Sequence, residues 1–282
     1  LRGPKGSWVK LKLMHENETE PFEVELKRTT IYLHSVARKV MLDEYGYIQI
    51  KSFQETTAKD VAEAFAWLQK TMTQNKKTMK GLILDLRNNP GGLLDQAIKV
   101  TDLFIEKGAI VSTKGRADSQ VEVNYAKKEG TLPYVPMAIL INDGTASASE
   151  IVAGALQDHL RATLIGTQTF GKGSVQTIVD LDDGSGLKMT IARYYTPKDR
   201  PIQNLGNQPD IFVSYFNYRP DEEYYRSEQS LERSLDTVEL NKKSTKKTKK
   251  KHEEEETRIL DSQLKASLEY LKISQKMTGQ NT

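Results

Sequence analysis

The stretch GLILDLRNNPGGLL, Gly81–Leu94, decides the fold. Its first part, Gly81–Leu86, is a nearly continuous apolar run, which is typical of a strand buried on both faces of a sheet. The run ends in Asn88–Gly92, a tight turn rich in Asn, Pro and Gly. Apolar residues then recur at helical spacing from Leu94 onward. The sequence therefore predicts a strand, a turn and a helix in succession.

A second unit of the same kind follows further along the chain. Pro136–Ile141 predicts another buried strand, Asn142–Thr145 a turn, and Ser147–His159 a helix. Strands and helices alternate elsewhere too, so the fold class is α/β. The other expected elements are a helix from Thr56 or Thr57 to about Thr73 and strands at Trp8–Met14, Phe22–Leu26, Gly46–Phe53, Ala109–Ser112, Gln120–Tyr125, Thr163–Ile165, Ser174–Leu181 and Leu187–Tyr195.

The composition excludes several classes of function. The 282 residues contain no cysteine, which excludes disulfides, thiolate metal sites and a cysteine nucleophile. The formal net charge of +3 gives no general electrostatic case for binding nucleic acid. No apolar run approaches the ~20 residues that span a bilayer, and Leu1–Gly6 does not resemble a signal peptide. We expect a cytosolic chain, or a mature form or fragment of a targeted one.

The composition changes past about Tyr218. Lysines dominate Asn241–Lys251, and Glu253–Glu256 is four glutamates, as in solvated linkers. We favour a linker here over a tail that binds nucleic acid. Leucines then recur at intervals of four, four and three residues, which predicts an amphipathic helix that packs on the body or on a partner; they are Leu260, Leu264, Leu268 and Leu271.

Chemistry is expected at the turns after the two buried strands, because ligands of open α/β sheets bind at the carboxyl ends of strands. Ser147 lies between two alanines at a strand-to-helix turn, which leaves room for a substrate. The amide of Ala148, at the helix N-terminus, is suited to stabilise an oxyanion. The amide of Gly91 or Gly92 in the other turn is the candidate second donor. The alternative for Ser147 is an ordinary helix N-cap.

The stretch GTQTFGKGSVQ, Gly166–Gln176, resembles a phosphate loop but fails as one. Gly173 stands where Ser or Thr would bind Mg²⁺, and a strand-like segment follows where a helix is needed. Lys172 has glycines on both sides, and the segment Phe170–Val175 contains no acid, so it is a candidate general base, with Gln176 to orient it. The alternative is an ordinary glycine-rich loop.

The histidines offer poor alternatives as a base for Ser147. His159 lies twelve residues further along the same predicted helix, which places it ~18 Å away. Proton transfer needs a separation of about 3 Å. His159 fits better as a residue that complements the dipole at the helix C-terminus.

Three blocks of the sequence resemble the carboxy-terminal processing proteases, a family of serine peptidases. They follow that family's order between about Glu44 and Val213. The blocks are LILDLRNNPGGLL, NDGTASASEIVAGALQDHLRATLIGTQTFGKGSVQ and DGSGLKMTIARYYTPKDRPIQNLGNQPDI.

The resemblance implies a role for each candidate residue. The family's nucleophile is the serine 25 residues before the lysine, a spacing that selects Ser147 over Ser149. The implied site is then Ser147 as nucleophile, Lys172 as general base, Gln176 as the third residue, and the amides of Ala148 and Gly92 as oxyanion donors, with Gly91 kept open. No metal or other cofactor is implied.

The resemblance also implies a domain organisation. Residues 21–218 would be a protease core of stacked β-sheet and helices, similar to the ClpP and crotonase folds. Residues 1–20 would be the last strands of a PDZ domain without its carboxylate-binding loop. Residues 219–282 would be a charged linker and a helical tail.

The function implied by the resemblance is a serine endopeptidase that cleaves unfolded or C-terminally tailed proteins. Its expected partners are proteins or peptides with apolar C-termini, with no nucleic acid and no nucleotide. The C-terminal tail is expected to contact a second copy of the chain or an adaptor protein. Bacterial members are exported, which implies a periplasmic or exported location. The alternative is a catalytically silent scaffold or binding protein on the same fold.

Overall fold

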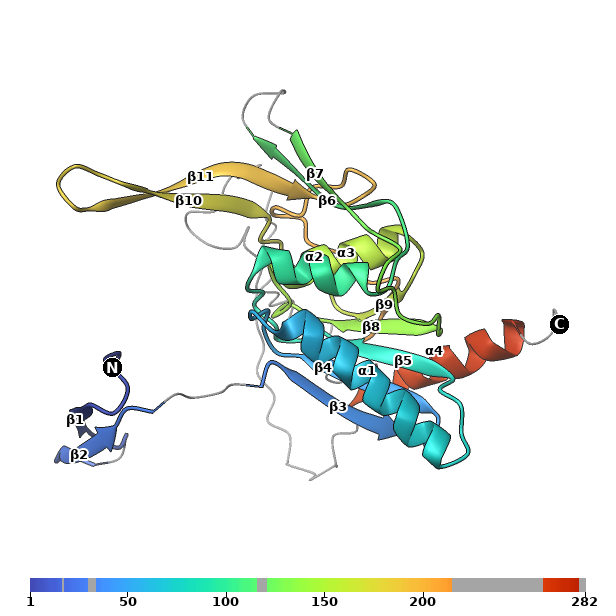
Figure 1. Cartoon of the computed structure of the whole chain (residues 1–282), viewed down its shortest axis with the longest axis horizontal. Coiled ribbons are helices and arrows are strands. Elements are labelled where there is room, and N and C mark those ends of the chain that lie inside the picture. Colours follow the sequence, from blue (N-terminus) through green and yellow to red (C-terminus); the bar gives the residue numbers. More distant parts are fainter. Residues whose placement is uncertain (17, 30–33, 116–120, 215–260, 279–282) are drawn as a thin grey trace, which may run out of the picture. The chain divides into compact units, whose positions relative to one another are not determined.

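The computed structural model describes residues 1–16, 18–29, 34–115, 121–214 and 261–278 (Figure 1). They divide into two compact units, Leu1–His34 and Ser35–Thr282. The first unit is an antiparallel hairpin of β1, Trp8–Leu13, and β2, Phe22–Lys27. Both strands are predicted from the sequence. That they are the end of a PDZ domain stays a prediction.

The second unit is built on a six-stranded sheet with the order β12–β9–β8–β5–β4–β3. Its neighbouring strands run parallel from β12 to β4, and β3 pairs antiparallel with β4. The two apolar runs of the sequence form β5 and β8 at the centre, where every residue is buried. The strands are β3 Val36–Met41, β4 Tyr45–Ile50, β5 Gly81–Asp85, β8 Met137–Ile141, β9 Thr163–Gly166 and β12 Ile211–Phe212.

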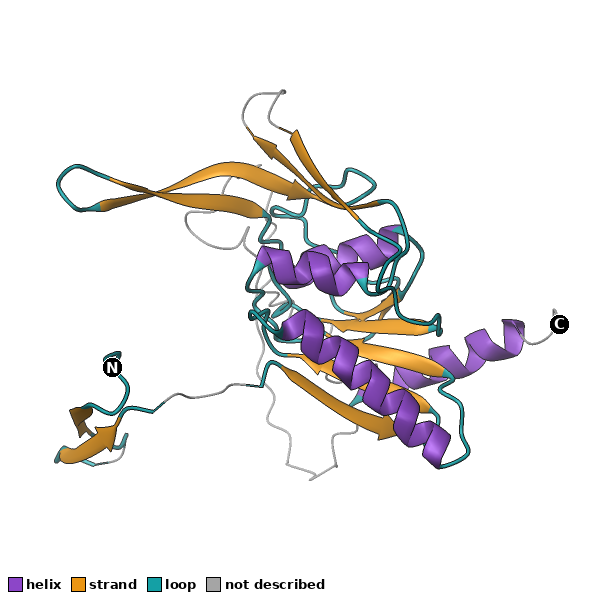
Figure 2. Cartoon of the chain, in the orientation of Figure 1, coloured by secondary structure: helices purple, strands orange, loops and turns teal. Residues whose placement is uncertain are grey.

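Helices cover both faces of this sheet (Figure 2). Leu82 and Leu84 of β5 point into the main core, which α1, α2 and α3 enclose. Ile83 points to the opposite face, where it packs in a second core with Leu271 of α4. The predicted amphipathic C-terminal helix therefore packs on the body. The helices are α1 Thr57–Gln74, α2 Leu94–Asp102, α3 Ala148–Asp158 and α4 Ser262–Thr278.

A second, antiparallel sheet has the order β10–β11–β6–β7. Its β10–β11 hairpin extends away from the helices (Figure 1), and several of its apolar side chains, such as Ile178, are exposed. β10 begins two residues after Lys172 and is an edge strand of the sheet. The strands are β6 Ala109–Gly115, β7 Val121–Tyr125, β10 Ser174–Asp180 and β11 Gly186–Tyr195.

The predicted α/β class is confirmed, and the predicted strands lie within three residues of their observed bounds, whereas the C-terminal helix α4 continues to Thr278, beyond the predicted leucines. The sequence analysis does not predict β3 or β12. In β3 the exposed Arg38 and Lys39 interrupt the apolar pattern, and β12 has two residues. Leu260 and the Lys-rich and Glu-rich segments lie outside the described residues. The similarity to ClpP and crotonase folds stays a prediction.

Candidate active site

The turns after β5 and β8 lie side by side because the two strands are parallel neighbours. The Thr145 hydroxyl donates a hydrogen bond to the Leu86 carbonyl at 2.9 Å. The Ala146 amide donates to the Asn89 carbonyl at the same distance. These bonds connect the two turns directly, so the structure brings together the two turns that the sequence analysis selects.

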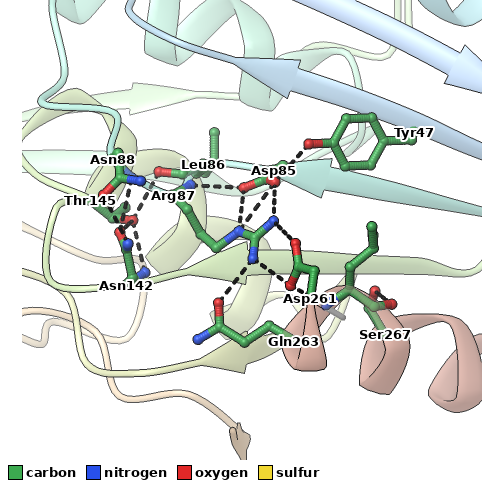
Figure 3. A network of polar contacts seen from close by, with 11 residues as sticks. Tyr47, Asp85, Leu86, Arg87, Asn88, Asn142, Thr145, Asp261, Gln263 and Ser267 are labelled. Carbon is green, nitrogen blue, oxygen red and sulfur yellow. Dashed lines mark hydrogen bonds and ion pairs between the residues drawn. The ribbon is translucent and has the colours of Figure 1, made fainter. Parts of the chain in front are cut away.

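A pair of asparagines strengthens this connection (Figure 3). The Asn88 amide donates to Asn142 Oδ1 at 2.9 Å, and Asn142 Nδ2 donates back to Asn88 Oδ1 at 3.0 Å. Asn142 Oδ1 also accepts the Gly144 amide at 3.1 Å. Asn88 has a φ of 55°, a left-handed conformation that asparagine tolerates better than most residues. The side chains therefore hold the two turns in one arrangement.

Asn89 is the buried centre of the first turn. Its Nδ2 donates to the Ile50 carbonyl at 2.8 Å, which connects the turn to β4. Its Oδ1 accepts the Gly91 amide at 2.9 Å, and its carbonyl accepts the Ser149 hydroxyl at 3.0 Å. The side chain is fully buried. Asn89 thus fixes the glycines of the turn relative to the start of α3.

Ser147 precedes α3 in an unusual backbone conformation, with φ 58° and ψ −119°. An ordinary N-cap residue has β-region dihedral angles. A non-glycine residue held at positive φ costs about 1–3 kcal/mol. Such strain at a strand-to-helix turn is how a nucleophilic serine is presented above an α/β sheet. A simple capping role does not explain this conformation.

The amides of Ala148 and Gly92 are available for an oxyanion. Among the residues that the structure describes, neither amide has an intramolecular acceptor, whereas the Gly91 amide donates to Asn89. A methyl group on Gly91 would lie 2.8 Å from Ser147 Cβ and 2.9 Å from the Ala148 nitrogen. The glycine turn thus approaches Ser147 closely and leaves the Gly92 amide free.

Glu150 is fully buried, and its carboxylate accepts four hydrogen bonds. Oε2 accepts the amides of Ser147 and Lys172, each at 2.8 Å. Oε1 accepts the Gly171 amide at 2.7 Å and the Thr169 hydroxyl at 2.5 Å. Because two nitrogens lie 2.8 Å from one oxygen, the backbone nitrogens of Ser147 and Lys172 are at most 5.6 Å apart (twice 2.8 Å).

The side chains of Lys172 and Gln176 are both exposed. The backbone beside Lys172 is nevertheless fixed, because the Gly173 amide donates to Gln203 Oε1 at 3.0 Å. A Cβ on Gly173 would lie 2.4 Å from the Gln203 nitrogen, so this close packing requires glycine. The structure therefore fixes the lysine backbone near Ser147 and leaves its side chain exposed.

The geometry disfavours two alternative roles, a phosphate loop at Lys172 and His159 as the base. β10 and not a helix follows Lys172, so this segment lacks the N-terminal amides of a phosphate loop. His159 is the C-cap residue of α3, and its Nε2 lies 2.7 Å from the Ala109 carbonyl oxygen. In the described ranges, no three His, Asp or Glu side chains are grouped to hold a metal ion. Nor does any helix there have the length and apolar character to cross a membrane.

A comparison with known protein families identifies the family to which the chain belongs. Residues 44–213, more than half of the chain, match peptidase family S41. The chain belongs to peptidase family S41. The matched range begins just before β4 and ends just after β12, so it contains every residue of the candidate site.

Two bacterial relatives are named as carboxy-terminal processing proteases. The "Carboxy-terminal-processing protease" of Bartonella bacilliformis is 47% identical over 213 residues, which are 76% of this chain and 48% of that protein. The "Carboxy-terminal processing protease CtpA" of Bacillus subtilis is 42% identical over 218 residues, 77% of this chain and 45% of that protein. The chain spans about half the length of the curated relatives it matches. The resemblance stated from sequence is confirmed.

A solved structure supports the S41 fold. The chain resembles the structure titled "Photosystem II D1 C-terminal processing protease" with a TM-score of 0.58 and 31% sequence identity. The match covers 75% of this chain and 57% of that one. The mixed α/β fold with more than one sheet is therefore shared with a processing protease of known structure.

Sequence reasoning missed Glu150 and Asn89 of the candidate site. A signal for Glu150 was present, because Ser147-x-x-Glu150 has the spacing of a capping box, in which the glutamate bonds to the amide before the helix. The hydrogen bond from the Gly171 amide to Glu150 Oε1 depends on tertiary structure and has no such signal. Asn89 carries no local signal beyond its place in a turn.

Proposed function

We propose that this S41 chain is the core of a serine endopeptidase that cleaves unfolded or C-terminally tailed proteins. The observation that carries the proposal is Glu150 Oε2, which accepts the amides of both Ser147 and Lys172. One buried oxygen thus holds the candidate nucleophile and the candidate base on adjacent backbone segments. The strained φ of Ser147 supports the same role.

The proposed reaction uses these groups in sequence. Neutral Lys172 takes the hydroxyl proton of Ser147 as Oγ attacks the carbonyl carbon of the scissile peptide. The amides of Ala148 and Gly92 donate to the oxyanion. Lys172 then gives the proton to the departing amine, the C–N bond breaks, and water hydrolyses the acyl-enzyme. Gln176 orients the lysine without adding charge.

Bound substrate completes the proposed site around Lys172. A lysine serves as a base where shielding from water disfavours its ammonium form, and the Lys172 side chain is exposed. β10 is an edge strand that starts beside this residue, so an extended peptide can pair along it. A peptide in that position would cover the lysine.

The names of the relatives support processing at the carboxyl terminus of a protein as the proposed activity. Their names describe processing at carboxyl termini, and we propose protein substrates with apolar C-termini and an exported location in a bacterium. The apolar face of α4 packs on its own sheet. A contact with a second copy or an adaptor would therefore use other parts of the tail.

The direct test is digestion of an unfolded protein, with the products resolved by mass spectrometry. We expect new C-termini after small or apolar residues, and no products from Ser147→Ala or Lys172→Ala. Intact substrate after prolonged incubation with a chain whose far-UV spectrum is folded would contradict the proposal.

Gly91→Ala should lower kcat/KM by about 10²-fold or more. The added methyl group would lie 2.8 Å from both the Ala146 carbonyl oxygen and Ser147 Cβ, closer than such contacts allow. The turn must move away, which displaces the oxyanion donor of Gly92, and loss of one such donor costs about 10²–10³-fold. Steady-state kinetics on a fluorogenic peptide would measure the loss.

Gly184→Ala is the matched control for this substitution. Gly184 has a φ of 80°, comparable with 101° at Gly91, but nothing lies within 4 Å of its Cβ position. The control therefore carries the strain of positive φ without the contact. Equal activities of the two variants would show that the close approach to Ser147 is irrelevant to catalysis.

Protonation of Glu150 should lower the activity at acidic pH. Burial raises the pKa of its carboxyl group to about 7, although the donated hydrogen bonds favour the carboxylate. Below that pH one oxygen must hold a proton, so at least one of its donors loses its acceptor. We expect kcat/KM of the parent to fall as the pH drops from 8 to 6. Glu150→Gln should be about 10- to 100-fold slower at pH 8 and should lose activity less steeply than the parent on acidification, because only the requirement for neutral Lys172 remains.

The contribution of Glu150 to the stability of the fold should increase on acidification, whereas the activity should decrease. The folded pKa lies above the ordinary 4.5, so the folded chain binds the proton more tightly than the unfolded chain. The contribution of Glu150 to the free energy of unfolding is present below pH 4.5 and is lost as the pH rises to about 7. The Tm of the parent minus that of Glu150→Gln should therefore grow on acidification. A Tm difference that shrinks together with the activity would contradict this interpretation.

A further inference from the structure

The guanidinium of Arg87 lies between two carboxylates that come from distant parts of the chain (Figure 3). On one side, Asp85 at the end of β5 accepts from Nε and, at 2.6 Å, from Nη2. On the other side, Asp261 immediately before α4 accepts from Nη1 and Nη2, each at 2.8 Å. Nη1 also donates to Gln263 Oε1 at 3.1 Å. All five N–H groups of the guanidinium can therefore be satisfied.

These groups, together with Tyr47, are called the Arg87 network below. The Tyr47 hydroxyl donates to Asp85 at 2.7 Å from the neighbouring strand. The side chains of Asp85 and Arg87 are 1% and 10% exposed, and that of Asp261 is 26% exposed. Although partial burial works against it, the hydrogen bond from Arg87 lowers the pKa of Asp261. The network is thus a shielded ion cluster in which Asp261 is charged at neutral pH.

The Arg87 network lies at the edge of the sheet where the candidate active site begins. The residue after Arg87 is Asn88, whose amide and side chain bond to Asn142 in the turn that leads to Ser147. The Asn88–Gly92 turn carries the proposed oxyanion donor at its end. A displacement of Arg87 is therefore passed directly to the backbone that faces Ser147.

α4 has other attachments that do not reach this edge. Leu271 is fully buried against the sheet, and the Thr163 hydroxyl donates to the Tyr270 hydroxyl at 2.6 Å. These contacts help to hold α4 against the six-stranded sheet. They do not require a charged residue beside Arg87, because a shielded ion pair is weak evidence for net stabilisation.

We propose that Asp261 is a positioning residue for the peptidase reaction: acting through Arg87, it fixes the Asn88–Gly92 turn relative to Ser147. This inference rests on the proposed function. It makes the attachment of the C-terminal helix a condition for an aligned oxyanion site. Asp261 itself does not touch the substrate.

The first test is a split between kcat and KM on an unfolded protein substrate. Asp261→Ala should lower kcat by about 30- to 100-fold, since misplacement by about 1 Å can cost that much, and should change KM less than threefold. Asp261→Glu, which keeps the carboxylate, should recover much of the loss. Tyr270→Phe is the matched control, because it removes a polar contact of α4 that lies away from Arg87 and should leave kcat within twofold. Equal effects of Asp261→Ala and Tyr270→Phe would overturn the proposal.

The second test does not depend on activity. Hydrogen–deuterium exchange of a peptide covering residues 86–93 reports on the Gly91 amide, which donates to Asn89. Its exchange should become about tenfold faster or more in Asp261→Ala and stay unchanged in Tyr270→Phe. Unchanged exchange in Asp261→Ala would refute the positioning role. If the parent chain cleaves nothing and exchange is still faster in Asp261→Ala than in the parent, the coupling of α4 to the turn would be supported and the proposed peptidase function would not.

Discussion

Replacing Ser147 with alanine should lower the cleavage of an unfolded protein by at least about 10⁴-fold while leaving the fold intact. The change removes the attacking oxygen and keeps the amide of residue 147, which still donates to Glu150. Losses of this size follow removal of the nucleophile in other serine peptidases. Initial rates measured by mass spectrometry, with Tm from a thermal melt, would test it.

Ser149→Ala is the matched control, two residues away in the same A-S-A-S-E segment. The buried Ser149 hydroxyl donates to the Asn89 carbonyl at 3.0 Å, so its removal costs about 1 kcal/mol of stability. The Asn89 carbonyl keeps the bond from Ala146, and activity should stay within tenfold. A chain that loses activity with Ser149→Ala and keeps it with Ser147→Ala would reverse the choice of nucleophile.

Lys172→Ala should cause a loss of similar size, because no other base is proposed for the hydroxyl proton. Lys172→Arg should be equally inactive, since a guanidinium keeps its charge and cannot accept a proton. Both variants retain the backbone bond from residue 172 to Glu150, so neither should unfold. Single-turnover rates would separate a lost chemical step from slow product release.

Lys188→Ala is the control for a general effect of charge, since Lys188 is an exposed lysine on β11. It should cleave at the rate of the parent. Full activity of Lys172→Arg would mean that position 172 supplies a positive charge and not a base. Binding of unfolded protein without turnover in every chain, the parent included, would support the scaffold alternative.

The sequence alone predicts the two strands and turns that carry the site, because each of them is determined by local sequence patterns. The apolar runs Gly81–Leu86 and Pro136–Ile141 predict two central strands, and the residues after them predict sharp turns. Parallel strands must end at one edge, so the meeting of the two turns follows from the pattern. The choice of Ser147 over Ser149 came from the family resemblance.

The contacts that tune the site could not be predicted in the same way. Arg87 and Asp261 are 174 residues apart in the chain, and no periodicity joins them. Glu150 resembles an ordinary capping glutamate until the structure brings Gly171 and Lys172 to its carboxylate. The exposure of Lys172 also depends on what covers it in space, which a one-dimensional pattern does not contain.

The position of α4 on the second face of the sheet has a consequence for folding. The strands β5, β8 and β9 can pair as soon as they are synthesised, but Ile83 and Leu140 on that face stay exposed to water until Leu271 arrives. Contacts of such large sequence separation form slowly, because loop-closure entropy is lost before the contact is gained. A nascent or prematurely terminated chain thus presents an apolar sheet surface of the kind that chaperones bind and that self-associates.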